Sequence, residues 1–431
     1  MLPGPLGRVH IFRGWWIVFT GYLTQIASGG ASGWVFGVLI LPMQHDLGWS
    51  RSTIVGVLTL EKLVGGACSV WLGPRLDRYG ARAVMAGSAA LGGALLLLIS
   101  QVQAPWQSYV LWAFMGLVSP GLMLLGPVVA ISNWFVRKRA QAIMFSTLSA
   151  ATSALLLAPA MAAVADAMSW RTAWLLTGLL MWATIPFSWL AIRRRPEDVG
   201  LVPDGSPPPA GTEDATERRV VAENEVDEFW TVPMALRSRS FWLLSLGFML
   251  TTLPAGSIYI HMSSFVQSRG FSVEAGAGAV SVYGLGVLAG RFIWGFAVAK
   301  AGLHRTLVTY AFLYGLSIFL FTLPHTLFAI YATTVFLGVA IAGAQQLRAQ
   351  AFPDYFGRRI VGTLLGYATV ISTITSASAP LIVAVAYDRT GSFVPTFLVW
   401  GACCLLAGTG FFFSKPKRPA GSLQASVSAG V

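Results

Sequence analysis

Long runs of apolar residues, each about as long as a lipid bilayer is thick, restrict what this chain can fold into. Residues 15–40, 83–99 and 241–260 contain no charged side chain. An α-helix needs about 20 such residues to cross the hydrocarbon core. Only 11% of the chain is charged and 55% is hydrophobic, so there are too few charges to cover soluble cores. We therefore predict an all-α protein embedded in the lipid bilayer.

Twelve membrane spans are expected, joined mostly by short polar loops. We place them at residues 14–43, 53–73, 82–101, 106–135, 139–165, 170–192, 240–268, 275–299, 305–323, 327–352, 360–387 and 394–414. One long polar segment, 193–239, carries a run of three prolines and mixed charge, and cannot bury enough surface to fold alone. Its last part, 229–239, is compatible with a short interfacial helix. The segment divides the spans six and six, which predicts six-helix domains at 1–192 and 240–431 joined by a cytoplasmic linker.

Basic residues indicate the orientation. Of 29 Lys and Arg, three fall within spans and four on the side opposite the termini, which leaves 22 on the side of the termini. Loops rich in Lys and Arg stay in the cytoplasm, so we predict a cell inner-membrane protein with both termini cytoplasmic. The same loops account for the net charge of +12, which argues against nucleic acid as a partner.

The two halves repeat each other. The segment Gly73–Gly80, after the second span, is matched 222 residues later by Gly295–Gly302, after the eighth. Trp134, followed by Phe135 and a basic pair, is matched 221 residues later by Tyr355. Two parallel six-helix repeats around a central site are the architecture of a rocking secondary transporter.

The segment Gly73–Arg82 resembles the major facilitator superfamily, in which it reads G-x-x-x-D-R-x-G-x-R/K. Stretches at 13–18, 46–51, 194–201 and 387–392 are similar to the bacterial monocarboxylate-transporter-like and oxalate/formate-exchanger branch. The resemblance covers essentially the whole chain except the linker. It implies the major facilitator fold and transport of small organic anions, often with a proton or against another anion.

Charged residues at membrane depth are costly and are therefore functional candidates. Arg291, in the eighth span, carries a planar guanidinium that matches a carboxylate through two parallel hydrogen bonds. The resemblance implies the same role, because the family carries a substrate-binding arginine on this helix. The alternative is that Arg291 reaches the inner interface or braces a neighbouring helix. Family members often have an acidic residue one turn earlier, where this chain has Val287, so the site of proton coupling stays open.

Three further titratable residues lie within spans. Glu61 and Lys62 are near the middle of the second span, and His261 is in the seventh. Adjacent helical residues point about 100° apart, so Glu61 and Lys62 do not face each other. We expect Glu61 or His261 to carry a coupling proton, and Lys62 and His261 to contact the substrate. The alternatives are a polar network between helices and a packing histidine.

A gate is expected on the side of the termini. Asp77, Arg78 and Arg82 fall in a predicted tight turn, where a carboxylate can bind a helix terminus or an arginine of the opposite half and hold one state. The alternative is a solvated turn. The second half has Ala299 in place of Asp77, so the gate should depend on Asp77 alone. Arg348, near the cytoplasmic end of the tenth span, is assigned to the same gate.

Polar side chains within the spans complete the candidate site. Tyr283 and Tyr367 are expected to bind substrate, and further lining candidates are Tyr259, Asn133 and Gln345.

The sequence thus predicts a monomeric secondary active transporter of a small monocarboxylate, such as lactate or pyruvate, with the proton as coupling ion. The alternatives are exchange of organic anions of the oxalate/formate kind and export of a larger amphipathic anion. We expect no enzyme activity, no metal and no cofactor. Neither paired-carboxylate nor Ser/His nor Cys/His signatures occur at a membrane interface, and no phosphate-binding G-x-x-x-x-G-K-[ST] loop is found.

Overall fold

A computed structural model describes residues 12–205 and 230–415, and every regular element in this part of the chain is helical. Twelve helices among these residues are long and apolar enough to cross a membrane, which confirms the predicted spans. The first six are α1–η1–α2 (Arg13–Gly29, Gly30–Val35, Phe36–Leu47), α3 (Arg51–Tyr79), α4 (Ala81–Ile99), α5–α6 (Pro105–Met123, Leu125–Trp134), α7–α8–η2–α9 (Arg139–Thr147, Ser149–Thr152, Ser153–Leu157, Ala158–Ala167) and α10 (Trp170–Ala191). The last six are α13 (Arg239–Ser268), α14 (Val273–Ala301), α15 (Leu303–Thr322), α16–α17 (Leu327–Ile341, Gly343–Phe356), α18 (Val361–Thr390) and α19 (Val394–Phe413).

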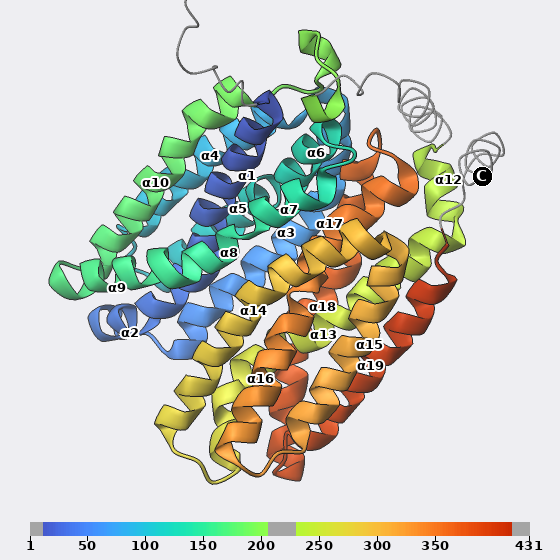
Figure 1. Cartoon of the computed structure of the whole chain (residues 1–431). Helices are drawn as coiled ribbons and strands as arrows, with labels where there is room; N and C mark the ends of the chain where they lie inside the picture. Colours follow the sequence, from blue (N-terminus) through green and yellow to red (C-terminus); the bar gives the residue numbers. More distant parts are fainter. Residues whose placement is uncertain (1–11, 206–229, 416–431) are drawn as a thin grey trace, which may run out of the picture.

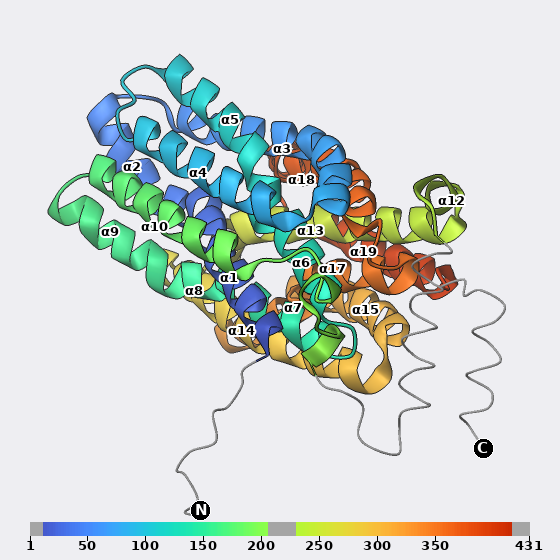
Figure 2. The same cartoon turned by 90° about the horizontal axis from the view of Figure 1, so that it is seen from above.

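The helices form two groups, which we call the N-half (13–191) and the C-half (239–413). The groups lie side by side in Figure 1 and in the view from above in Figure 2. They meet where α3 packs along α18 and where α14 packs on α7 and α8. Because the number of spans is even, α1 begins and α19 ends at the same end of the bundle, which we call the termini face.

Small residues let α3 and α18 pack closely near the termini face. A Cβ added to Gly73 would meet the carbonyl oxygen of Gly362, and one added to Gly366 would meet that of Ser69. Small residues at such positions allow close backbone approach between helices in a membrane. The two halves are therefore in direct backbone contact at this seam.

Two spans contain π-helical segments at mid-length. η1 interrupts the first span and η2 the fifth, and the two segments pack against each other inside the N-half. Wider turns of this kind often mark functional positions in helices. Hydrophobic periodicity alone did not distinguish them from continuous α-helix.

The predicted turn after Gly73 is wrong. α3 continues through Pro74 to Tyr79, and the chain turns at Gly80, whose φ is +80°. Proline removes only one main-chain donor, and the remaining hydrogen bonds carry the helix past it. Asp77 therefore projects from a helix rather than from a loop.

Part of the expected linker is docked on the N-half. The indole of Trp134 donates to the carbonyl of Arg193, and the buried carboxylate of Asp204 accepts hydrogen bonds from the main-chain N–H groups of residues 136–138. A short helix, α12 (Val232–Arg237), precedes α13 within the region where an interfacial helix was expected. The proline run at 207–209 lies outside the described residues.

Candidate functional site

A buried arginine lies where the two halves meet. Arg291, on α14, is 6% exposed and stands ten residues before Ala301, about 15 Å along the helix axis. Its Nη2 donates a hydrogen bond of 3.4 Å to Oε1 of Gln345 on α17, whereas its Nη1 is buried with no partner. A buried donor without an acceptor costs free energy. The arrangement therefore offers a hydrogen-bond donor to an anionic oxygen.

Gln346 holds the backbone around Arg291. With its amide oriented to satisfy both groups, its nitrogen donates to the carbonyl of Arg291 and its oxygen accepts from the N–H of Gly295, each over 3.2 Å. These two groups are the ends of one helical hydrogen bond, so the amide bridges a turn of α14. Gly295 packs against Met144 of α7, which places this turn directly against the N-half.

A second, partly buried arginine lies on the neighbouring helix. Nη2 of Arg348, on α17, donates to Oγ1 of Thr369 on α18 over 3.0 Å, and its Nε is buried without a partner. In the part of the chain that the structure describes, neither Arg291 nor Arg348 pairs with a carboxylate. Buried charges are costly unless they are paired. Two cations without a counter-ion among the described side chains give this region a positive potential that favours an anion.

Aromatic rings form a row on the side of Arg291 away from the termini face. Trp34 of η1 contacts Tyr259 of α13, with ring centroids 5.8 Å apart, and Tyr259 contacts Tyr283 of α14 at the same distance. Tyr283 precedes Arg291 by two helical turns on α14 and is buried. The Trp34–Tyr259 contact joins the two halves. We call these three residues the aromatic row.

The N-half contributes a set of hydrogen-bonded polar side chains. The hydroxyl of Tyr22 bonds to that of Thr152 over 2.7 Å, and Gln25 donates to Ser146 and accepts from Ser149. These residues connect α1 to α7 and α8, the helices that face α14. Neither this set nor Trp34 was among the residues predicted from the sequence. The sequence feature that could have indicated this set is the helical spacing of uncharged polar residues in the first and fifth spans.

Glu61 and Lys62 lie in different environments on α3, as their helical spacing predicts. Glu61 is buried, and α3 at this point packs closely against Gly116 of α5. Lys62 is exposed, one turn before Gly66, which packs against Thr373 of α18. Neither residue has a hydrogen bond to Arg291 in the described structure.

His261 and Tyr367 are placed within the C-half. The Nε2–H of His261 donates to the carbonyl of Pro380 on α18 over 3.1 Å, and its ring lies 5.7 Å from that of Phe393. Tyr367, on α18, is half-buried against the apolar core. Of the predicted site residues, Arg291 thus contacts Gln345 and lies close to Tyr283. The described contacts of His261 are instead with Pro380 of α18 and with Phe393.

Asp77 binds the N-terminus of α18 across the two halves. One carboxylate oxygen accepts the N–H of Gly362 over 2.8 Å, and the other accepts the N–H and hydroxyl of Thr363 over 2.7 and 2.6 Å. A carboxylate at this end of a helix satisfies orphan donors and complements the helix dipole. We call this contact the Asp77 latch.

Further contacts close the termini face. Arg139 of α7 forms an ion pair with Asp354 of α17. Arg358 donates to the carbonyl of Asn133 over 3.1 Å and to Glu197 over 3.0 Å. Together with the Asp77 latch, the ion pair of Arg139 with Asp354 and the hydrogen bond from Arg358 to Asn133 therefore join the two halves at the termini face.

Arg78 and Arg82 remain in the N-half. Arg78 is exposed, with its guanidinium 5.3 Å from the centre of the Tyr79 ring. Arg82 stacks on Trp189 of α10 at 4.2 Å. In the described structure both arginines lie at the termini face, as the Asp77 latch does, but the rings that they contact belong to the N-half.

The repeat that relates Gly73–Gly80 to Gly295–Gly302 gives the Asp77 latch an equivalent position between α14 and α7. A cavity of about 190 Å³ occupies this position. Ala299 of α14 stands in place of Asp77, and the start of α7 stands in place of the start of α18. Ala299 and the first residues of α7 line the cavity, together with Asp354 and the buried Gln350. Among the described residues, the side chain of the N-cap residue Lys138 makes no capping hydrogen bond, and the carboxylate that accepts the Lys138 N–H, Asp204, is docked on the same half rather than on the C-half. The latch is thus built in one copy only.

Ala299→Asp is expected to create a second latch. The new carboxylate would fill the cavity next to Arg137 and Arg139 and accept first-turn N–H groups of α7. Such a contact contributes about 1 kcal/mol, so transport should slow roughly fivefold with substrate affinity unchanged. Initial uptake rates and equilibrium binding measure this. Ala299→Leu fills the same space without charge and serves as control; equal slowing in both variants would show an effect of volume alone.

Comparison with known proteins identifies similar chains. The sequence pattern described as Major Facilitator Superfamily matches residues 21–282 and 273–429. The human protein Monocarboxylate transporter 11 is 24% identical over 390 residues, which cover 86% of this chain and 75% of that protein. The Gentisate transporter of Corynebacterium glutamicum is 23% identical over 414 residues, which cover 92% and 85%.

Solved structures show the same fold. The proton:xylose symporter XylE superposes with a TM-score of 0.71 at 12% identity, over 94% of this chain and 96% of the other. FucP in its outward conformation gives a TM-score of 0.68 at 12% identity, over 95% and 100%. At such identities the likeness concerns the fold alone.

Proposed function

This chain belongs to the Major Facilitator Superfamily, and from that membership we propose that it transports a small monocarboxylate of the lactate or pyruvate kind by alternating access. The observation that carries this proposal is Arg291: a buried guanidinium at the junction of the halves, with a free donor and no carboxylate partner in the described chain. A substrate carboxylate supplies the missing charge and acceptor. The name of the human relative, Monocarboxylate transporter 11, agrees with a single carboxylate.

A larger amphipathic anion is the second candidate. The aromatic row beside Arg291 offers apolar faces to the body of such a substrate, and aromatic rings pack favourably with one another at these distances. A relative named for the transport of gentisate is consistent with a ring-bearing carboxylate. Exchange of one organic anion for another stays an alternative to net transport.

Alternating access requires contacts that exist in one state and break in the other. In our proposal the Asp77 latch and the ion pair of Arg139 with Asp354 close the termini face, which is cytoplasmic, while the Trp34–Tyr259 contact closes the other side. The protein works as a monomer in the inner membrane. A bound carboxylate shifts the balance between states only by its different affinity for each.

Uptake into proteoliposomes tests the function. The purified protein is given labelled lactate, pyruvate, formate, oxalate and gentisate, with and without an inward proton gradient. We expect monocarboxylates to accumulate and the gradient to stimulate their uptake. Uptake only when a second anion is loaded inside would identify an exchanger. No uptake of any organic acid would reject the proposal.

Glu61 is proposed as the site of proton coupling, since it is the one acidic residue near the middle of a span and it is buried. Glu61→Gln should make uptake independent of the imposed pH gradient, while exchange of labelled for unlabelled substrate continues. Exchange survives because it does not require the carrier to release its proton. Lys62→Gln is the control: it should keep the pH dependence and weaken substrate affinity.

A Glu61→Gln protein with the pH dependence of the wild type would remove Glu61 from this role. His261, whose ring contacts the carbonyl of Pro380 through Nε2, would then be the next candidate.

A further inference from the structure

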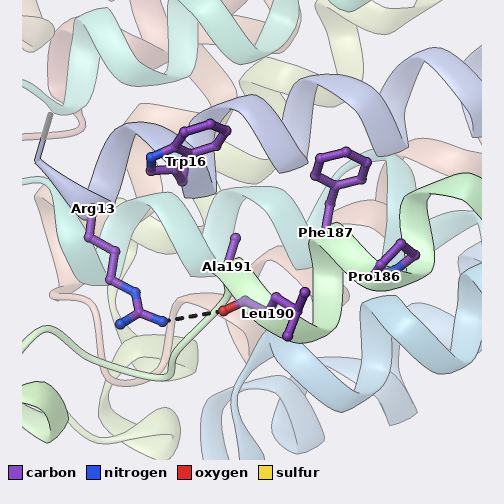
Figure 3. Close-up of a pocket in the computed structure, with 6 residues that line it drawn as sticks. All are labelled: Arg13, Trp16, Pro186, Phe187, Leu190 and Ala191. Atoms are coloured by element: carbon purple, nitrogen blue, oxygen red, sulfur yellow. Dashed lines mark hydrogen bonds between the residues drawn. The ribbon is translucent and has the colours of Figure 1, made fainter.

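A groove on the outer surface of the N-half lies between α1 and α10, close to the termini face. It encloses about 440 Å³ and is lined by Arg13, Trp16, Pro186, Phe187, Leu190 and Ala191. Figure 3 shows the arginine at one end of the groove, while Trp16 and Phe187 point into its middle. The groove is separate from the Arg291 site, which lies between the two halves.

Arg13 is the charged residue that lines the groove, and two further arginines lie around the adjoining end of α10. Nη2 of Arg13 donates to the carbonyl of Leu190 over 3.2 Å, in the last turn of α10. Arg193, two residues beyond α10, donates to the carbonyl of Trp189, and Arg82 stacks on the ring of Trp189. Three guanidiniums thus surround one helix end. Each presents several N–H donors in a fork that suits a phosphate.

The rest of the groove is apolar and faces outward from the bundle. Trp16 is 50% exposed, and Leu190 and Phe187 are also exposed. Pro186 lies more than one turn further into the span than Ala191, so the groove runs from the charged end toward the middle of the membrane. Tryptophan next to arginine at the start of a span is typical of the membrane–water interface.

We propose that this groove binds an anionic phospholipid, with the phosphate on Arg13 and one acyl chain along Trp16 and Phe187. The charged end lies at the depth of lipid headgroups and the apolar part at the depth of acyl chains. A soluble anion would gain nothing from the apolar walls, and a zwitterionic lipid would bring its own positive charge close to the guanidinium of Arg13. Basic pockets between spans on this side of a membrane favour anionic headgroups.

Native mass spectrometry of the full chain in detergent tests this. The protein is titrated with phosphatidylglycerol and, separately, with phosphatidylcholine of the same acyl chains. We expect phosphatidylglycerol to bind at least about tenfold more tightly, equal to about 1.4 kcal/mol. Arg13→Gln should remove that preference, because the phosphate loses its main donor.

Two variants separate this site from general effects of charge or folding. Ala191→Phe fills the groove without changing charge and should also abolish tight binding. Arg239→Gln removes the arginine that begins the seventh span, which lies over Phe413 rather than in this groove, and should leave binding as in the wild type. Equal binding of both lipids by the wild type, or equal loss in Arg13→Gln and Arg239→Gln, would overturn the proposal.

Discussion

Replacing Arg291 with lysine is expected to abolish most transport while the protein still inserts and folds. A lysine keeps a positive charge but presents a point charge instead of a planar fork, so the paired hydrogen bonds to a carboxylate are lost. Charge-assisted hydrogen bonds contribute about 1.5–3 kcal/mol each, which corresponds to a loss of roughly 10- to 150-fold in substrate affinity. Binding by the detergent-purified protein and uptake by proteoliposomes measure the two effects.

Arg348→Lys is the matched control for Arg291→Lys. Arg348 is also an arginine of the C-half with a buried N–H that has no partner, but it is only partly buried and its hydrogen bond goes to Thr369 of α18. If Arg348 serves the gate, its replacement should change the transport rate and leave affinity near that of the wild type. Unchanged affinity in Arg291→Lys would remove Arg291 from the binding site.

Asp77→Asn is expected to slow transport strongly without weakening substrate binding more than a few-fold. Both carboxylate oxygens accept hydrogen bonds from the start of α18, so an amide nitrogen in place of one oxygen sets donor against donor. Loss of such a charged acceptor costs about 2 kcal/mol, which shifts the balance of states roughly 30-fold away from a closed termini face. Cysteine labelling on the two faces should show this face becoming more accessible.

Asp204→Asn provides the control for Asp77→Asn. Asp204 is another buried acid at the termini face that accepts main-chain N–H groups, but all of these belong to the N-half. Its replacement should lower stability without changing the accessibility of either face. If both variants respond alike, or if Asp77→Asn binds weakly with unchanged accessibility, Asp77 supports the site or the fold instead.

The fold was predictable from sequence because membrane spans are local features. Apolar length sets each span, and the repeated segments at Gly73 and Gly295 identify the two halves. The helical course of 73–79 was not predictable from the glycine and proline there, since packing of Gly73 on Gly362 stabilises the helix beyond the expected turn.

The candidate site was predictable only in part. Arg291 stood out because a charge at membrane depth is rare, yet Gln345 and Gln346 owe their contacts with it to the packing of α14 on α17. The partner of Asp77 lies more than 280 residues away in the sequence. Trp34 could not be predicted as a site residue, because aromatic residues are common in apolar spans. Only the structure shows its contact with Tyr259 of the other half.

The single copy of the Asp77 latch has a consequence for transport kinetics. With Ala299 opposite the start of α7, a carboxylate that reaches from one half to a helix start of the other is present at the α18 position and not at the corresponding α7 position. An empty carrier that rests with the termini face closed presents its site mainly to the other compartment. Apparent affinity falls in proportion to the fraction of molecules competent to bind. In the proposed orientation, with the termini face cytoplasmic, half-saturating substrate concentration should therefore be lower for entry than for exit, with a correspondingly lower maximal rate of entry.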